Sequence, residues 1–129
     1  DVETLEGDAF AVLKDLCDEK RKFDIVVLDP PALIPRRRDQ KAGEEAYARL
    51  NQLGLRLLGR DGLLVSASCS MHLSQEKLTD IIRGSGRKID RFVQLLEQGH
   101  QAPDHPVVPG IPETDYIKSC FVRSLTGFL

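Results

Sequence analysis

The segment Phe23–Leu28 is an apolar, β-branched run that stops abruptly at Asp29-Pro30-Pro31. Such a run predicts a strand buried on both faces, as in parallel sheets. Neither proline donates a backbone hydrogen bond and both hold the chain extended, so sheet pairing must end there. Asp29 would then lie at the carboxyl end of the strand, where open α/β sheets bind their ligands. For this segment alone, the alternative is an ordinary strand that ends in a Pro-Pro turn.

The rest of the chain alternates between the helical and the extended hydrophobic period. Helices are predicted over Ala9–Glu19, Ala42–Leu58 and Lys77–Lys88, and strands over Val2–Leu5, Gly62–Ser70, Phe92–Glu97 and Tyr116–Leu125. Ser74 is the candidate N-cap of the third helix. A long segment rich in Pro and Gly joins the last two strands in place of a helix, which favours an antiparallel pair at the sheet edge. The sequence therefore predicts an α/β fold with a doubly wound, mostly parallel sheet and a reversed last strand.

Composition excludes several classes of protein. A hydrophobic content of 41% and a charged content of 29% are typical of a soluble globular domain. No apolar stretch approaches the about 20 residues that cross a bilayer, and the acidic start does not resemble a signal peptide. We therefore expect a cytoplasmic protein with no membrane contact. The three cysteines, Cys17, Cys69 and Cys120, show neither disulfide nor metal-ligand spacing, so no metal is expected.

Four motifs follow one another along the chain. They are Asp29-Pro30-Pro31, Ser66-Ala67-Ser68-Cys69-Ser70, Gln101-Ala102-Pro103-Asp104-His105-Pro106 and Tyr116-Ile117-Lys118. In this order they resemble the carboxyl half of the RlmI-like class I methyltransferases, which methylate carbon 5 of a cytosine in 23S ribosomal RNA. The resemblance covers nearly the whole chain. It implies a Rossmann-like class I sheet, S-adenosylmethionine as cofactor and ribosomal RNA as partner.

The chemistry of carbon-5 methylation needs a thiol and an acid. Carbon 5 of cytosine is a poor nucleophile until a thiolate adds to carbon 6, which pushes electron density onto carbon 5. Cys69 is the candidate nucleophile. A carboxyl group in a partly dry pocket can hydrogen-bond or protonate ring nitrogen 3 as charge develops there, and Asp29 is the candidate for this role. For Cys69, the alternative is a small buried hydrophobic residue.

The resemblance also implies binding residues. Asp8 stands where class I methyltransferases place a carboxylate that binds the adenine amino group, and Asp29 and Pro30 are expected to contact the cofactor too. Asp8 is equally suited to cap a helix. Pro31 and the basic run Arg36, Arg37 and Arg38 are candidates for RNA contact, with a solvated loop as the alternative for the arginines. The resemblance marks Lys118 as recurrent without giving it a role.

Two parts of the family's proteins do not occur in the sequence: the glycine-rich cofactor turn and the amino-terminal PUA-type RNA-binding domain. We therefore expect residues 1–129 to be the carboxyl-terminal part of a class I methyltransferase domain, with the first strands missing. This would leave Ile25–Leu28 as an apolar sheet edge. We expect such an edge to pair with Val2–Leu5 or with a second copy of the chain, and we expect weak cofactor binding by these residues alone.

Two other functions fit the same motifs. An amino-group methyltransferase of RNA or DNA also uses an Asp-Pro-Pro loop, but it needs no thiol. A non-catalytic RNA-binding module could keep the fold without a cofactor site. Loss of carbon methylation on replacing Cys69 would separate the first alternative from the thiol mechanism.

Overall fold

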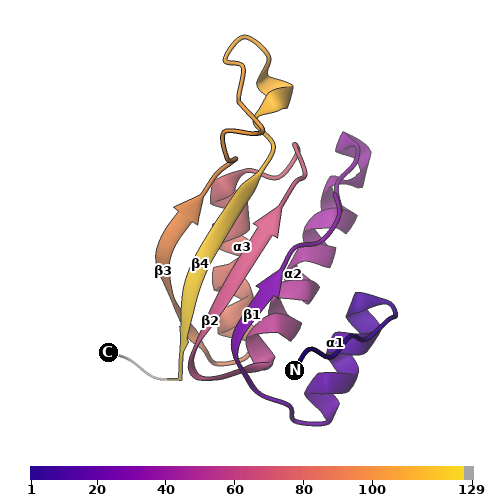
Figure 1. Cartoon of the computed structure of the whole chain (residues 1–129), viewed down its shortest axis with the longest axis vertical. Helices are drawn as coiled ribbons and strands as arrows, with labels where there is room; N and C mark the ends of the chain where they lie inside the picture. Colours follow the sequence, from indigo (N-terminus) through magenta and orange to yellow (C-terminus); the bar gives the residue numbers. More distant parts are fainter. Residues whose placement is uncertain (127–129) are drawn as a thin grey trace.

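The computed structural model describes residues 1–126. It contains three α-helices and four β-strands (Figure 1). In chain order these are α1 (Ala9–Asp18), β1 (Phe23–Leu28), α2 (Gln40–Arg56), β2 (Leu58–Ser68), α3 (Gln75–Lys88), β3 (Phe92–Gly99) and β4 (Lys118–Leu125). Short 3₁₀ turns occupy Arg37–Asp39 and Pro112–Thr114. No helix among the described residues has the length and apolar character that crossing a membrane requires.

The strands form one sheet in the order β1-β2-β4-β3. β1 and β2 are parallel, and β4 runs antiparallel to both of its neighbours, β2 and β3. Three strands therefore point one way and the last strand is reversed, which confirms the predicted α/β class and the reversed last strand. The expected antiparallel pair lies at one edge of the sheet, with β4 inserted beside β2.

Helices α2 and α3 pack together against one face of the sheet, and α1 flanks α2 near the β1 edge (Figure 1). Between the helices and the sheet lies one hydrophobic core, whose residues include Leu28, Leu50, Leu64, Leu78, Ile82 and Val122. Two predicted N-caps are present, since Asp8 accepts a hydrogen bond from the Ala11 N–H at 3.0 Å and Ser74 accepts one from the Lys77 N–H at 3.0 Å. These caps satisfy amide groups that the first helical turn leaves without partners.

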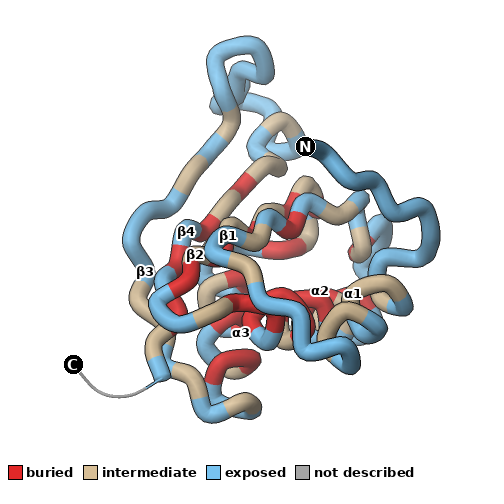
Figure 2. The backbone as a smooth tube through the Cα atoms, turned by 60° about the horizontal axis from the view of Figure 1, so that its bottom comes forward, coloured by how far each residue is buried: buried red, intermediate tan, exposed pale blue. Residues whose placement is uncertain are grey.

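The prediction that β1 is buried on both faces is wrong. Leu28 is buried against the helices, but Ile25 and Val27 point to the opposite face and are 58% and 63% exposed. The reason is that all three helices of the described chain lie on one side of the sheet, so nothing covers the other side. Figure 2 shows the same asymmetry, with buried residues gathered where the helices meet the strands.

The strand predicted over Val2–Leu5 is also absent. Residues 1–6 have no regular secondary structure, and all of them are exposed (Figure 2). A strand needs a neighbouring strand for its hydrogen bonds, and this segment pairs with no edge of the sheet. β1 is therefore an edge strand, as predicted for Ile25–Leu28. Val2–Leu5 does not pair with it.

Candidate active site

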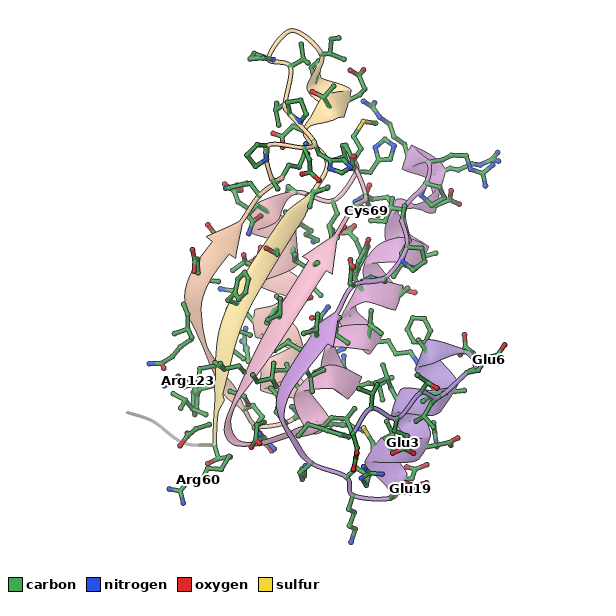
Figure 3. All side chains as sticks on the ribbon, in the orientation of Figure 1. Glu3, Glu6, Glu19, Arg60, Cys69 and Arg123 are labelled. Atoms are coloured by element: carbon green, nitrogen blue, oxygen red, sulfur yellow. The ribbon has the colours of Figure 1, made fainter. Side chains whose placement is uncertain are left out.

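The candidate catalytic residues follow two strands that run in parallel. Asp29 comes directly after β1, and Cys69 comes directly after β2. The register pairs Leu28 with Ser66, so both strands end at the same edge of the sheet. Figure 3 places Cys69 at this edge, beyond the tip of β2. This is the edge at which parallel α/β sheets bind ligands.

Cys69 faces the loop that leaves β1. Its Sγ lies 4.0 Å from the backbone carbonyl oxygen of Pro30, and the thiol is free and partly exposed. The alternative of a sealed core cysteine describes Cys120 instead, which has no exposed surface. The structure thus brings Cys69 next to the Asp29-Pro30-Pro31 loop. Asp29 itself is exposed, so no dry pocket surrounds its carboxylate within the described chain.

Asp8 and Asp29 line one cavity of about 660 Å³, together with Pro30 and Pro31. Its apolar wall comes from α1, α2, β1 and the segment before α1, and it includes Leu5, Phe10, Leu13, Val27 and Leu50. The Asp8 Oδ2 that caps α1 is one of two carboxylate oxygens, so its helix-capping role leaves acceptor capacity for a ligand. The volume lies within the range of small-molecule sites.

The three candidate RNA-binding arginines, Arg36, Arg37 and Arg38, are exposed in and before the 3₁₀ turn that leads into α2. Arg36 Nε donates to Asp39 Oδ2 at 3.0 Å, which ties its guanidinium to the same turn. All three lie within nine residues of Asp29 in sequence, on the loop that begins at the candidate site. Among residues 1–126, no group of three or more His, Cys, Asp or Glu side chains is arranged to hold a metal ion.

A buried polar cluster next to Cys69 was not predicted from the sequence. The Tyr47 hydroxyl of α2 lies 2.8 Å from Ser68 Oγ and 2.8 Å from Ser70 Oγ, and the Ser70 N–H donates to Ser68 Oγ at 3.1 Å. Tyr47, Ser68 and Ser70 are all at most 1% exposed. In the sequence, Tyr47 is one apolar position of an amphipathic helix, and only the two serines beside Cys69 signalled a polar environment.

Comparison with known proteins agrees with this geometry. No protein-family model matches the chain. It is 38% identical over 119 residues to a Methanocaldococcus jannaschii protein provisionally named a ribosomal RNA large subunit methyltransferase. It is 34% identical over 121 residues to ribosomal RNA large subunit methyltransferase I of Escherichia coli. The chain is homologous to one part of these methyltransferases. The two matches cover 92% and 94% of the chain but only 30% and 31% of the relatives.

Solved structures support the fold. A protein described as a methyltransferase and solved with S-adenosylhomocysteine superposes with a TM-score of 0.73 at 19% identity, over 91% of this chain and 30% of the other. A methyltransferase homologue from Pyrococcus horikoshii gives a TM-score of 0.61 at 21% identity, over 91% and 43% of the two chains. The sheet is therefore part of a class I methyltransferase fold. The resemblance to the RlmI-like enzymes that the motifs indicated is confirmed by the sequence relatives.

Proposed function

We propose that the full-length protein is an S-adenosylmethionine-dependent methyltransferase that acts on carbon 5 of a cytosine in large-subunit ribosomal RNA. We assign residues 1–129 to the carboxyl-terminal part of its catalytic domain. The observation that carries the proposal is the approach of Cys69 Sγ to the Pro30 carbonyl at 4.0 Å, which sets a partly exposed thiol against the Asp-Pro-Pro loop. The names of the sequence relatives support an RNA substrate.

The cavity beside Asp8 and Asp29 fits the cofactor's chemistry. Apolar side chains such as Phe10 and Leu13 suit a flat adenine ring, and the two carboxylates suit amino and hydroxyl donors. When bound, S-adenosylmethionine supplies an electrophilic methyl group. We infer that Asp8 accepts a hydrogen bond from the adenine amino group and that Asp29 and Pro30 form the wall next to the substrate.

Two of the chain's own residues, Cys69 and Asp29, would act in the reaction. Cys69 loses its proton to solvent and its thiolate adds to carbon 6 of cytosine, which forms a carbon–sulfur bond and makes carbon 5 nucleophilic. Asp29 acts in its carboxylic-acid form and donates a hydrogen bond to ring nitrogen 3 as negative charge develops there. After carbon 5 gains the methyl group, a base removes the carbon 5 proton, and the carbon–sulfur bond breaks to return the thiolate. Cofactor and RNA would supply the drier surroundings that Asp29 lacks here.

RNA binding is assigned to the loop after Asp29. Arg36, Arg37 and Arg38 are exposed cations of the kind that bind a phosphate backbone, and we assign to exposed Pro31 a contact with the substrate base. The local charge matters because the whole sequence has a formal net charge of −2. Replacing the three arginines with Gln is expected to weaken RNA binding and its salt dependence without changing cofactor binding.

Trapping with RNA that carries 5-fluorocytosine tests the proposal in the full-length protein. Fluorine cannot leave carbon 5 as a proton does, so the adduct with Cys69 should accumulate and appear in peptide mass spectra. Cys69→Ala should abolish both the adduct and carbon-5 methylation. Cys17→Ala is the matched control, because Cys17 is also a free, partly exposed thiol but lies on α1 outside the site.

Two results would contradict the mechanism. Methylation that survives Cys69→Ala and falls on an exocyclic nitrogen would identify an amino-group methyltransferase. RNA binding without any methylation, in a full-length protein that also fails to bind S-adenosylmethionine, would identify a non-catalytic RNA-binding module.

A further inference from the structure

A buried lysine lies under the candidate nucleophile. Lys118 begins β4, is 7% exposed and pairs in register with Ser68 of β2. Its Nζ donates a hydrogen bond of 2.6 Å to the backbone carbonyl of Ser70, the residue that follows Cys69. Within residues 1–126, no salt bridge contains Lys118. A buried ammonium that forms no close ion pair costs stability, which makes Lys118 a candidate for a functional role.

Charge couples Lys118 to the thiol. Burial lowers the pKa of Lys118, while the negative charges of Asp115 and of the Cys69 thiolate act in the opposite direction. The hydrogen bond from Lys118 Nζ to the Ser70 carbonyl places the ammonium at the residue that directly follows Cys69. A cation beside a cysteine favours the thiolate, which is the nucleophilic form.

The same turn is fixed from two other sides. Tyr47 of α2 binds the Ser68 and Ser70 hydroxyls, and the backbone N–H of Ile34 donates to Ser70 Oγ at 3.3 Å. Ile34 belongs to the loop that begins at Asp29, so Ser70 links the Cys69 turn to that loop. Lys118 completes the arrangement from β4. Helix α2, the loop after β1 and β4 thus all hold Ser70, the residue next to Cys69.

We propose that Lys118 is a positioning residue for Cys69, which fixes the turn through the Ser70 carbonyl and supplies the positive charge that stabilises the thiolate. This inference rests on the proposed role of Cys69 as the nucleophile. It deepens that role, because it names the source of the thiol's activation. Other titratable or charged groups on the surrounding elements are Asp29 after β1, His72 in the same turn, Asp115 before β4, Glu44 on α2 and Lys77 on α3.

The three thiols allow a direct test in the full-length protein without RNA or cofactor. Iodoacetamide alkylation is followed as a function of pH, and each cysteine is quantified separately by peptide mass spectrometry. Cys69 reports the site, partly exposed Cys17 is an internal reference, and Cys120 reports loss of structure because it has no exposed surface. In the wild-type protein, Cys69 should reach half of its maximal rate at a lower pH than Cys17, since burial raises the pKa of Cys17.

Two variants remove the charge of Lys118, one with and one without the hydrogen bond. Lys118→Gln can still donate to the Ser70 carbonyl but carries no charge, and Lys118→Met removes both. In either variant the Cys69 profile should move upward by about one pH unit, which slows alkylation near neutral pH about tenfold. Lys88→Met, at an exposed lysine in the last turn of α3, is the matched control and should leave the profile unchanged.

An unchanged Cys69 profile in a variant that still protects Cys120 would overturn the proposal, and so would wild-type Cys69 that titrates at or above Cys17. Either variant that keeps Cys120 protected is decisive, and the wild-type comparison needs no variant. Failure of the two proposals is distinguishable. A shifted alkylation profile without a 5-fluorocytosine adduct would keep Lys118 as a positioning residue and reject the reaction, and the converse would reject only the role of Lys118.

Discussion

The two faces of the sheet differ in how fully the chain covers them. On the helical face Leu64, Cys120 and Val122 are at most 3% exposed, whereas on the open face Val27 is 63% and Phe121 37% exposed. Cross-strand neighbours on the open face are also apolar, since Val27 pairs with Val65 and Val65 with Phe121. A contiguous apolar surface of this kind marks an interface. The chain therefore encodes a sheet suited to two covered faces and supplies helices for one.

The largest predicted effect compares two adjacent leucines of β2 that lie on opposite faces of the sheet. Leu64 is buried against the helices, and Leu63 is partly exposed on the open face. Leu64→Ala should lower the free energy of unfolding of the 129-residue chain by about 2–5 kcal/mol. Leu63→Ala should lower the free energy of unfolding by only about 1 kcal/mol, because Leu63 buries less apolar surface on folding than Leu64 does. Urea unfolding followed by circular dichroism measures both, and equal costs would mean that the open face is covered in solution.

Gly43 tests how α2 seats the loop that follows Asp29. An added Cβ at Gly43 would lie 2.6 Å from the Leu33 carbonyl oxygen and against the Ile34 side chain. Gly43→Ala should therefore cost about 1–3 kcal/mol through overpacking. Gly84→Ala in α3 is the matched control, because a Cβ there meets nothing within 4 Å. It should stabilise the helix by about 0.5–1 kcal/mol, so the two thermal midpoints should move in opposite directions.

The exposed edge of β1 leads to a prediction about dimerisation. Ile25 is 58% exposed on an edge strand without a partner, and exposed apolar edges pair with other strands. We predict that the 129-residue chain dimerises at high concentration and that Ile25→Lys weakens the dimer at least about tenfold, since a lysine on an edge strand opposes pairing. Val107→Lys, at an equally apolar but distant loop position, should have no effect. Light scattering that shows a monomer at every concentration would contradict the prediction.

Features set by neighbouring residues could be predicted from the sequence. The caps at Asp8 and Ser74, the end of β1 before Asp29 and the position of Cys69 after β2 all depend on local patterns and on the rule that parallel strands end at one edge. The approach of Cys69 to the Pro30 loop follows from the same rule.

Features set by distant or absent partners could not be predicted. Burial of Ile25 depends on what lies over the open face, and a strand at Val2–Leu5 needs an edge that the chain does not offer. The contact between Lys118 and Ser70 joins residues that are 48 positions apart. Lysine in a strand pattern suggests a solvated side chain, so only the structure identifies it as buried.

The smallest predicted effect is the pH dependence of stability that comes from Cys120, a thiol on the covered face of the sheet. Burial raises the pKa of its thiol above the ordinary value of 9.0, although hydrogen bonds with Thr79 and Gln75 act the other way. Above pH 9.0 the unfolded chain loses this proton before the folded chain does, so stability is lost as the pH rises toward the folded pKa. The slope contributed by Cys120 is at most about 1.4 kcal/mol per pH unit.

Lys118 acts in the opposite direction over alkaline pH, because its pKa is lowered by burial and the folded chain releases that proton first. The contribution of Cys120 is therefore read as a difference in slope between the wild type and Cys120→Ser, which removes the titration and keeps a small polar side chain. Urea unfolding between about pH 8.5 and 10.5 should show a flatter loss of stability in this variant. Cys17→Ser should flatten the slope less, because Cys17 is partly exposed and carries less desolvation. If the free energy of unfolding fell with pH at the same slope in the wild type and both variants, Cys120 would be as accessible to water in the folded chain as Cys17. The covered face would then exclude water no better than α1 does.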